Sequence, residues 1–199
     1  MAAWKPLPGE TPIDDISGLK PKWVTTRDEL NDVEAQNIRK GVMRYLATKP
    51  SRRKAPFTPE WCLKLHQQMF GEVWKWAGKK RTCELNIGVP FHRIDVELKS
   101  LMDDLEYWRK VGEMDSIEQV ARLHHRAVFI HPFLNGNGRW SRLLANIFQK
   151  RSTGKLTLWP EETVGNASVI RDEYLAAIRS ADRGDFASLI ALHRRYSGA

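Results

Sequence analysis

Residues 115–130 (DSIEQVARLHHRAVFI) and 143–148 (LLANIF) are apolar stretches, and the segment HPFLNGNGRWSR at 131–142 separates them. In the first stretch apolar residues occur on more than one side of a helix, which is typical of a buried central helix. Pro132 cannot continue that helix, and a new one is expected to begin near Gly138. The sequence therefore predicts a mainly α-helical protein built around a buried helix–loop–helix.

The loop between these helices carries groups that suit an anion. Gly136 and Gly138, on either side of Asn137, permit positive φ angles, so that successive N–H groups can point into one concavity. The N-terminal end of the next helix favours the same anion. Arg139 and Arg142 share one helix face, and two forked guanidinium groups suit a polyphosphate. The alternative, a plain Asn-Gly-Asn-Gly turn between helices, explains neither the buried setting nor the paired arginines.

His131, at the end of the buried helix, is the candidate general base, because an imidazole with a pKa of about 6.5 can accept a proton near neutral pH. The alternative is a core histidine bonded to a carbonyl group. Phe133 is expected to turn into the core and anchor the loop. His124 shares a helix face with His131, but no third ligand follows at a metal-site spacing, which favours a structural role. The same role is expected for the other histidines: His66, His92, His125 and His193.

Composition bounds the class of protein. The 199 residues are 42% hydrophobic and 28% charged, which is ordinary for a globular chain. A net charge of +8 favours anionic partners such as nucleotides, nucleic acid or an acidic protein. No stretch is apolar enough to span a membrane, and no secretory signal is visible. Cys62 and Cys83 are too few for a disulfide framework and are expected to fill small gaps in the core of a cytoplasmic protein.

Local patterns place the remaining elements. Residues 1–24 are rich in proline and predict an extended arm, followed by one domain over 25–199. A capping box at Thr26–Glu29 begins a helix that runs to about residue 48. The other predicted helix starts are Thr58-Pro59, a second capping box at Asp115–Glu118, and N-caps at Asn166 and Asp185, with Gly184 ending the helix between the last two.

The motif in the central loop, His-Pro-Phe-x-x-Gly-Asn-Gly-Arg-x-x-Arg, resembles the signature of the Fic/Doc family. The segment Trp76-Ala77-Gly78-Lys79-x-Arg81-Thr82 is similar to the family's lead into its flap, and Arg171-x-x-Tyr174-x-x-Ala177-Ile178 also fits. The resemblance spans roughly residues 25–197, and within the family the chain is similar to the mobile mystery protein B group. It implies a Fic-like helical bundle.

The resemblance also implies an activity. Fic proteins mostly transfer AMP from ATP to a Ser, Thr or Tyr hydroxyl of a target protein. His131 would be the base, and Asn137 with the Gly136 and Gly138 amides would hold the α-phosphate. Arg139 would bind the β- and γ-phosphates and Arg142 the γ-phosphate.

One position departs from the family pattern. Asn135 stands where an acidic residue usually binds Mg²⁺. An amide oxygen is a hard ligand without charge, so a weaker magnesium site is expected, held partly by the phosphates of ATP.

Residues 82–93 alternate loosely between apolar and polar, with a turn at Gly88-Val89-Pro90, and predict the one β-hairpin. In the family this hairpin is the flap, whose edge can hold a target segment by β-augmentation. The alternative is a hairpin without a function. The docking residues expected in it are Thr82, Leu85, Asn86, Ile87 and Gly88.

Many relatives are inhibited by a glutamate that pairs with the second arginine of the motif. Glu29 matches that pattern in part, but the capping box already uses it. Glu34 lies on the apolar face of its helix, where a carboxylate needs a cation, and Arg142 is the expected partner. The alternatives are a pair with Arg39, a solvated side chain, or inhibition by a separate antitoxin protein.

Two other functions remain open. A phosphotransferase of the Doc type would transfer the γ-phosphate, although that class usually has Lys at the position of Gly138. A basic nucleic-acid-binding or scaffold protein with a vestigial nucleotide site is the other, although no nucleic-acid-binding motif is visible. AMP transfer by a toxin-like or regulatory protein is the leading hypothesis.

Overall fold

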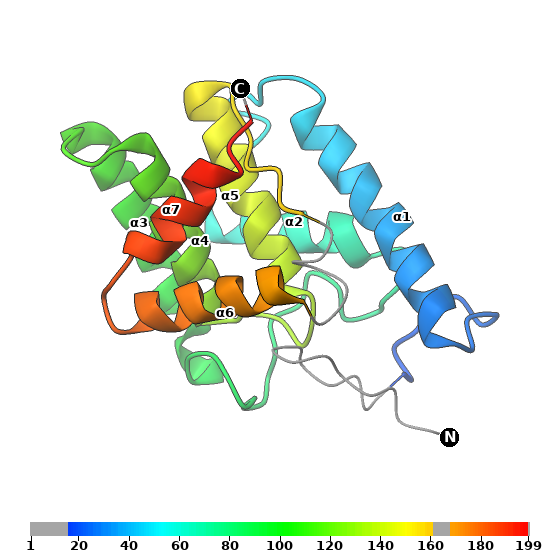
Figure 1. Cartoon of the computed structure of the whole chain (residues 1–199). Coiled ribbons are helices and arrows are strands. Elements are labelled where there is room, and N and C mark those ends of the chain that lie inside the picture. Colours follow the sequence, from blue (N-terminus) through cyan, green and yellow to red (C-terminus); the bar gives the residue numbers. More distant parts are fainter. Residues whose placement is uncertain (1–15, 161–167, 199) are drawn as a thin grey trace.

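The computed structural model describes residues 16–160 and 168–198, which form a bundle of α-helices (Figure 1). The described helices are α1 (Arg27–Leu46), α2 (Pro59–Phe70), α3 (Ile94–Val111), α4 (Ser116–Ile130), α5 (Asn137–Thr153), α6 (Val169–Asp182) and α7 (Ala187–Arg195), with a short 3₁₀ turn, η1 (Phe91–Arg93), before α3. The prediction of a mainly helical fold is confirmed.

The helix pair α4–α5 forms the centre of the bundle. α4 packs against α3, α5, α6 and α7, while α1 and α2 pack against each other and against α5. Figure 1 shows α1 (blue) along one edge of the view and α6 and α7 (orange and red) toward the other. The loop that joins α4 to α5 therefore has two different neighbours, α1 with α2 and α6 with α7.

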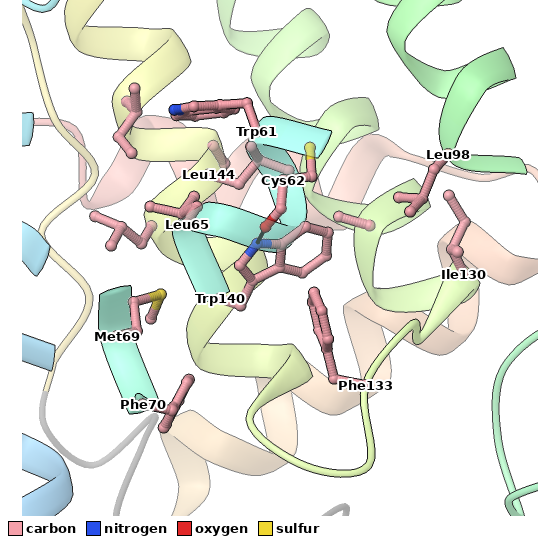
Figure 2. Close-up of a cluster of buried hydrophobic side chains, with 14 of the residues drawn as sticks. Trp61, Cys62, Leu65, Met69, Phe70, Leu98, Ile130, Phe133, Trp140 and Leu144 are labelled. Carbon is pink, nitrogen blue, oxygen red and sulfur yellow. Dashed lines mark hydrogen bonds between the residues drawn. The ribbon is translucent and has the colours of Figure 1, made fainter. Parts of the chain in front are cut away.

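Large side chains fill the core behind this loop. Phe133 of the loop and Trp140 of α5 are fully buried, with their rings edge to face at 5.1 Å. The Nε1–H group of Trp140 donates to the Cys62 carbonyl of α2 at 3.1 Å, so the indole nitrogen is satisfied inside the core (Figure 2). This packing holds the loop against α2.

Two of the predicted helix starts are confirmed by their caps. The Thr26 hydroxyl accepts a bond from the Glu29 amide at 3.2 Å, and the Glu29 carboxylate accepts one from the Thr26 amide at 3.0 Å. The Thr58 hydroxyl accepts a bond from the Trp61 amide at the start of α2. Both caps satisfy N–H groups that the first helical turn leaves without a partner.

The helix predicted to start at Asp115–Glu118 does begin there, with Asp115 as the N-cap residue, but the capping box itself is wrong. The Asp115 side chain makes no capping bond to α4 and instead pairs with Arg194 at 3.0 Å. The Glu118 carboxylate pairs with Arg122 one turn along the same helix at 2.7 Å. Salt bridges on the helix surface have thus replaced the cap.

The predicted β-hairpin at 82–93 is also wrong. Within the described residues only isolated bridges occur, Leu19 with Trp74 and Thr157 with Ser197, and neither lies in this segment. Residues 82–90 follow an irregular path, and η1 then leads into α3. Helix α3 was not predicted from the sequence, although the buried residues of this helix recur at helical spacing: Ile94, Leu98, Leu101, Met102 and Leu105.

The predictions for the amino-terminal arm and for the starts of the last two helices are confirmed only in part. Residues 16–24 of the predicted arm lie against the bundle, with Leu19 and Val24 buried, while 1–15 lie outside the described residues. Asn166 also lies outside them, and Ser168 caps α6. Phe186, and not Asp185, is the N-cap residue of α7, although the Asp185 carboxylate accepts a bond from the Ala187 amide at the start of that helix.

The two cysteines are not equivalent. Cys62 is buried as predicted, but Cys83 is exposed, so the prediction that both fill the core is wrong for Cys83. Among the described helices, none is both long enough and apolar enough to cross a lipid bilayer.

Candidate functional site

His131 ends α4 in an unusual backbone conformation. Its φ of 51° and ψ of 59° lie in the left-handed region, which side chains with a Cβ rarely adopt. Gly88 approaches it so closely that a Cβ at position 88 would lie 2.6 Å from the His131 Cβ. The backbone conformation and the neighbouring segment together fix where the imidazole lies.

The imidazole of His131 is held in its neutral form. Its Nδ1 lies 3.3 Å from the Val128 carbonyl, which accepts the Nδ1 proton and leaves the lone pair on Nε2. Burial lowers the pKa of His131 to about 4. The ring therefore stays uncharged at neutral pH, with its one proton on Nδ1, as a general base requires.

The loop after His131 is braced from within. The Asn137 side chain accepts a bond from the Phe133 amide at 2.9 Å and donates one to the Phe133 carbonyl at 2.8 Å. Gly136 has a φ of 78°, and a Cβ there would lie 2.7 Å from the Phe70 ring. In this state the Asn137 amide shapes the loop, whereas the sequence analysis expected it to hold a phosphate.

His66 of α2 props the same loop from behind. Its ring stacks on Phe133 at 3.6 Å, its Nε2–H donates to the Asn135 carbonyl at 3.0 Å, and its Nδ1 accepts from the Gly78 amide at 3.0 Å. Burial lowers its pKa to about 3, so that it stays neutral in this arrangement. A structural role for His66 was predicted from the sequence, but its contact with the loop was not.

Arg81, which lies in the lead into the predicted flap, bonds that segment to the loop, a contact that was not predicted from the sequence. Its amide donates to the Pro132 carbonyl, and its Nε donates to the His131 carbonyl at 2.8 Å. The other guanidinium nitrogens donate to the carbonyls of Cys83 and Val89. A buried arginine bonded to four carbonyls of two separate segments fixes their relative position.

Arg139 forms an ion pair with Glu34 of α1. Glu34 is 3% exposed and also accepts a bond from the Trp74 Nε1 at 2.6 Å. The expectation that Glu34 pairs with Arg142 is wrong, because the inward face of α1 meets the first arginine of the motif. Glu29 keeps its capping role, as expected.

Arg142 turns the other way, toward α6. Its guanidinium lies over the Tyr174 ring, 5.6 Å from the ring centre. Burial lowers the pKa of Arg142. The two arginines therefore share a helix face but contact different neighbours.

The segment expected to dock a target lies beside His131 but has no regular strand. Leu85 is half-buried, and the other expected docking residues are exposed: Thr82, Asn86, Ile87 and Gly88. Gly88 is the residue of this segment closest to His131.

Asn135 is the one expected metal ligand. Its Oδ1 accepts bonds from the Gly136 amide at 2.6 Å and from Arg139 at 3.3 Å. In the described part of the chain, no group of three His, Cys, Asp or Glu side chains could hold a metal ion. The donor set fits a weak magnesium site at most, with one neutral protein oxygen and the remaining ligands from elsewhere.

A comparison with protein-family models finds the Fic/DOC family over residues 56–149, which include α2, the loop and most of α5. Residues 56–149 belong to the Fic/DOC family. The match covers the loop signature, His131 and both arginines. It also covers His66 and Arg81, whose contacts with the loop could not be predicted from the sequence.

Known relatives of this Fic domain are larger proteins. The chain is 34% identical over 150 residues to the protein adenylyltransferase fic-1 of Caenorhabditis briggsae, covering 69% of this chain and 28% of that protein. It is 28% identical over 162 residues to the protein adenylyltransferase Fic of Drosophila grimshawi, covering 79% and 31%. The chain thus spans less than a third of the length of these relatives.

Solved structures show the same fold. Fic-1 of C. elegans superposes with a TM-score of 0.70 at 24% identity, over 89% of this chain and 51% of that one. The BepC protein of Bartonella tribocorum, determined with bound AMPPNP, superposes with a TM-score of 0.67 at 17% identity, over 92% and 93%. Both establish the architecture around the α4–α5 loop.

Proposed function

We propose that this chain transfers AMP from ATP to a hydroxyl group of a target protein. The observation that carries the proposal is the neutral imidazole of His131, which directly precedes a glycine loop and two arginines at the N-terminus of α5. The relatives named protein adenylyltransferases lend support.

The chemistry needs a base and positive charge in fixed places. His131 Nε2 takes the proton of the target's Ser, Thr or Tyr hydroxyl, whose oxygen forms a bond to the α-phosphorus of ATP. The bond from that phosphorus to the bridging oxygen breaks, and pyrophosphate leaves with the electron pair. Backbone N–H groups at the start of α5 stabilise the negative charge on the transferred group, while Arg139 and Arg142 hold the departing phosphates.

Asn135 would contribute one oxygen to a Mg²⁺ ion, and the ion would neutralise part of the phosphate charge. Both bonds that Asn135 Oδ1 now accepts come from groups beside the phosphate site, Gly136 and Arg139. When Arg139 turns to a phosphate, this oxygen loses one donor and can take a cation.

Isotopically labelled ATP tests the reaction directly. A lysate and the chain with Glu34→Gly are incubated with ATP labelled at the α- or the γ-phosphorus. We expect the α-label, and not the γ-label, on protein, and its loss with an added His131→Ala. Transfer of the γ-label would indicate a phosphotransferase of the Doc type instead.

We also propose that Glu34 inhibits the site in the same chain. Its carboxylate occupies the guanidinium of Arg139, which the phosphates of ATP would otherwise engage. Because Glu34 is part of this chain, inhibition needs no separate antitoxin. Glu34→Gly should raise autoadenylylation at least about tenfold, since a buried ion pair competes for the arginine.

Asp32→Gly is the matched control for Glu34→Gly. Asp32 is an exposed acidic residue of the same helix, so the control carries the same helix-propensity cost of about 1 kcal/mol. Equal activities of Asp32→Gly and Glu34→Gly would exclude Glu34 as the inhibitor. We place the reaction in the cytoplasm, where ATP is available and the two free cysteines stay reduced.

A further inference from the structure

A chain of buried hydrogen bonds leads from Tyr174, a neighbour of Arg142, through the core. The Arg142 guanidinium lies over the Tyr174 ring, 5.6 Å from its centre, and the Tyr174 hydroxyl lies 3.2 Å from His124 Nε2. His124 Nδ1 lies 3.0 Å from His193 Nε2, and His193 Nδ1 lies 2.9 Å from the Thr157 hydroxyl. With Arg142, these groups come from five segments: α5, α6, α4, α7 and the segment at residue 157.

The chain continues to the carboxy-terminal segment. The Thr157 hydroxyl donates to the Gln149 side-chain oxygen at 2.8 Å, and the Gln149 amide nitrogen donates to the Ser197 hydroxyl at 3.0 Å. Backbone bonds at the Thr157–Ser197 bridge, between Leu158 and Tyr196 and between Gly198 and Leu156, hold the two segments together. The far end of the chain is therefore also fixed.

Only one direction of donation satisfies every proton along this path. The Thr157 hydroxyl donates its single proton to Gln149 Oε1, so it accepts from His193 Nδ1. The neutral His193 ring then accepts at Nε2 from His124 Nδ1, and His124 Nε2 accepts the hydroxyl proton of Tyr174. Each donor thus has one acceptor.

Water is excluded from the inner bonds of this path, between Tyr174 and Gln149. His124, His193 and Gln149 are fully buried, Thr157 is 1% exposed and Tyr174 is 6% exposed. Burial lowers the pKa of both histidines, that of His193 to about 3, so the path stays uncharged at neutral pH. A buried network in which every polar group is satisfied is rigid.

We propose that Tyr174, held in place through His124 and His193, is the positioning residue that aims the Arg142 guanidinium at the terminal phosphate of ATP. The proposal rests on the proposed function of the site. A neutral aromatic ring suits this task, because it orients the guanidinium without neutralising the charge that the phosphate needs. Glu34 acts on the neighbouring arginine in the opposite way.

Nucleotides with and without the terminal phosphate separate this role from general stability. Titration calorimetry measures the affinities for AMPPNP and ADP of the full chain with Glu34→Gly, alone and with Tyr174→Phe. Removing the hydroxyl breaks the bond that holds this ring to His124, so Arg142 loses its fixed neighbour and AMPPNP should bind about tenfold more weakly. ADP affinity should stay within about twofold, because Arg142 does not contact it.

Two further variants complete the test. Tyr196→Phe removes a phenol of the same aromatic cluster that bonds to Arg195 outside the path, and should change neither affinity. Thr157→Val breaks the path farther from Arg142 and should weaken AMPPNP binding less than Tyr174→Phe does, again without affecting ADP.

The outcomes distinguish the two proposals. If the Glu34→Gly protein binds neither nucleotide, the proposed function fails and this inference falls with it. If it binds both, an unchanged AMPPNP affinity in Tyr174→Phe, or an equal loss for AMPPNP and ADP, overturns the positioning role alone.

Discussion

Arg139 and Arg142 lie one turn apart on α5, yet they contact opposite kinds of partner. Arg139 reaches α1 and pairs with the carboxylate of Glu34. Arg142 reaches α6 and lies over the neutral ring of Tyr174, 5.6 Å from its centre. The first contact is between opposite charges, and a phosphate can displace the carboxylate. The second leaves the positive charge of Arg142 available, so a phosphate adds to it.

The difference divides the surroundings of the loop into two sides. On the α1 side, the ion pair with Glu34 determines whether Arg139 is available to bind a phosphate. On the α6–α7 side, a buried uncharged network holds Arg142 in place whether or not that ion pair is formed. The same loop can thus be regulated from α1 while keeping a fixed geometry toward α6 and α7.

The largest expected effect is a loss of folding stability in acid. It comes from buried histidines on the α6–α7 side and around the loop. His66, His124, His131 and His193 are buried with lowered pKa values in the folded protein. Below about pH 6.5 the unfolded chain binds protons that the native state does not, so acid favours unfolding. Each histidine contributes up to about 1.4 kcal/mol per pH unit, and the four together up to about 5.

Urea unfolding at pH 7.5, 6.5 and 5.5 measures this slope. His193→Gln removes one of the four groups from the α6–α7 side and should reduce the slope by about a quarter. A free energy of unfolding that does not change between pH 7.5 and 5.5 would refute the account of the buried histidines.

The next effect concerns the apolar support that both sides share. Phe133→Ala should cost about 3–5 kcal/mol of stability, because it leaves a cavity between His66 and Trp140. Phe129→Ala, at a position 42% exposed, is the matched control and should cost far less. Similar losses in thermal or urea unfolding would show that Phe133 does not anchor the loop.

Removing the clamp on the flap segment should have a smaller effect. Arg81→Met keeps the apolar stem but leaves buried carbonyls without a donor, at a cost of about 2 kcal/mol. Thermolysin should then cleave faster within residues 82–90. Arg93→Met, which removes a largely exposed arginine paired with Glu97, should leave that rate unchanged. A cleavage rate unaffected by Arg81→Met would argue against the clamp.

The smallest effect is on magnesium. Asn135→Asp adds a charged oxygen beside Arg139 and should lower the Mg²⁺ concentration needed for half-maximal activity several-fold. Asn31→Asp adds the same charge on the exposed face of α1 and should not. If the two variants need equal Mg²⁺, Asn135 is not a ligand.

The helical core and the loop were predictable because their determinants are local. The apolar run of 115–130, the break at Pro132 and the cap at Thr26 each depend on neighbours within a turn or two, and the structure contains all three. The burial of Phe133 followed from the same logic.

The errors came from contacts between distant segments. The alternation in 82–93 predicted strands, but Arg81 bonds this segment to the motif loop instead, and no partner strand is described beside it. The partner of Glu34 depends on how α1 crosses α5, which helix phase alone does not specify. The path from Tyr174 through His124 to His193 joins three helices, and no spacing in the sequence indicates it.

The most direct test of the contrast between the two arginines is the ratio of AMPPNP to AMP affinity, measured by calorimetry in the wild-type chain and in Glu34→Gly. If Glu34 withholds Arg139 from the phosphates, the ratio should rise at least about tenfold in Glu34→Gly while AMP affinity stays unchanged. An equal ratio in the two proteins would contradict the exchangeable role of this ion pair.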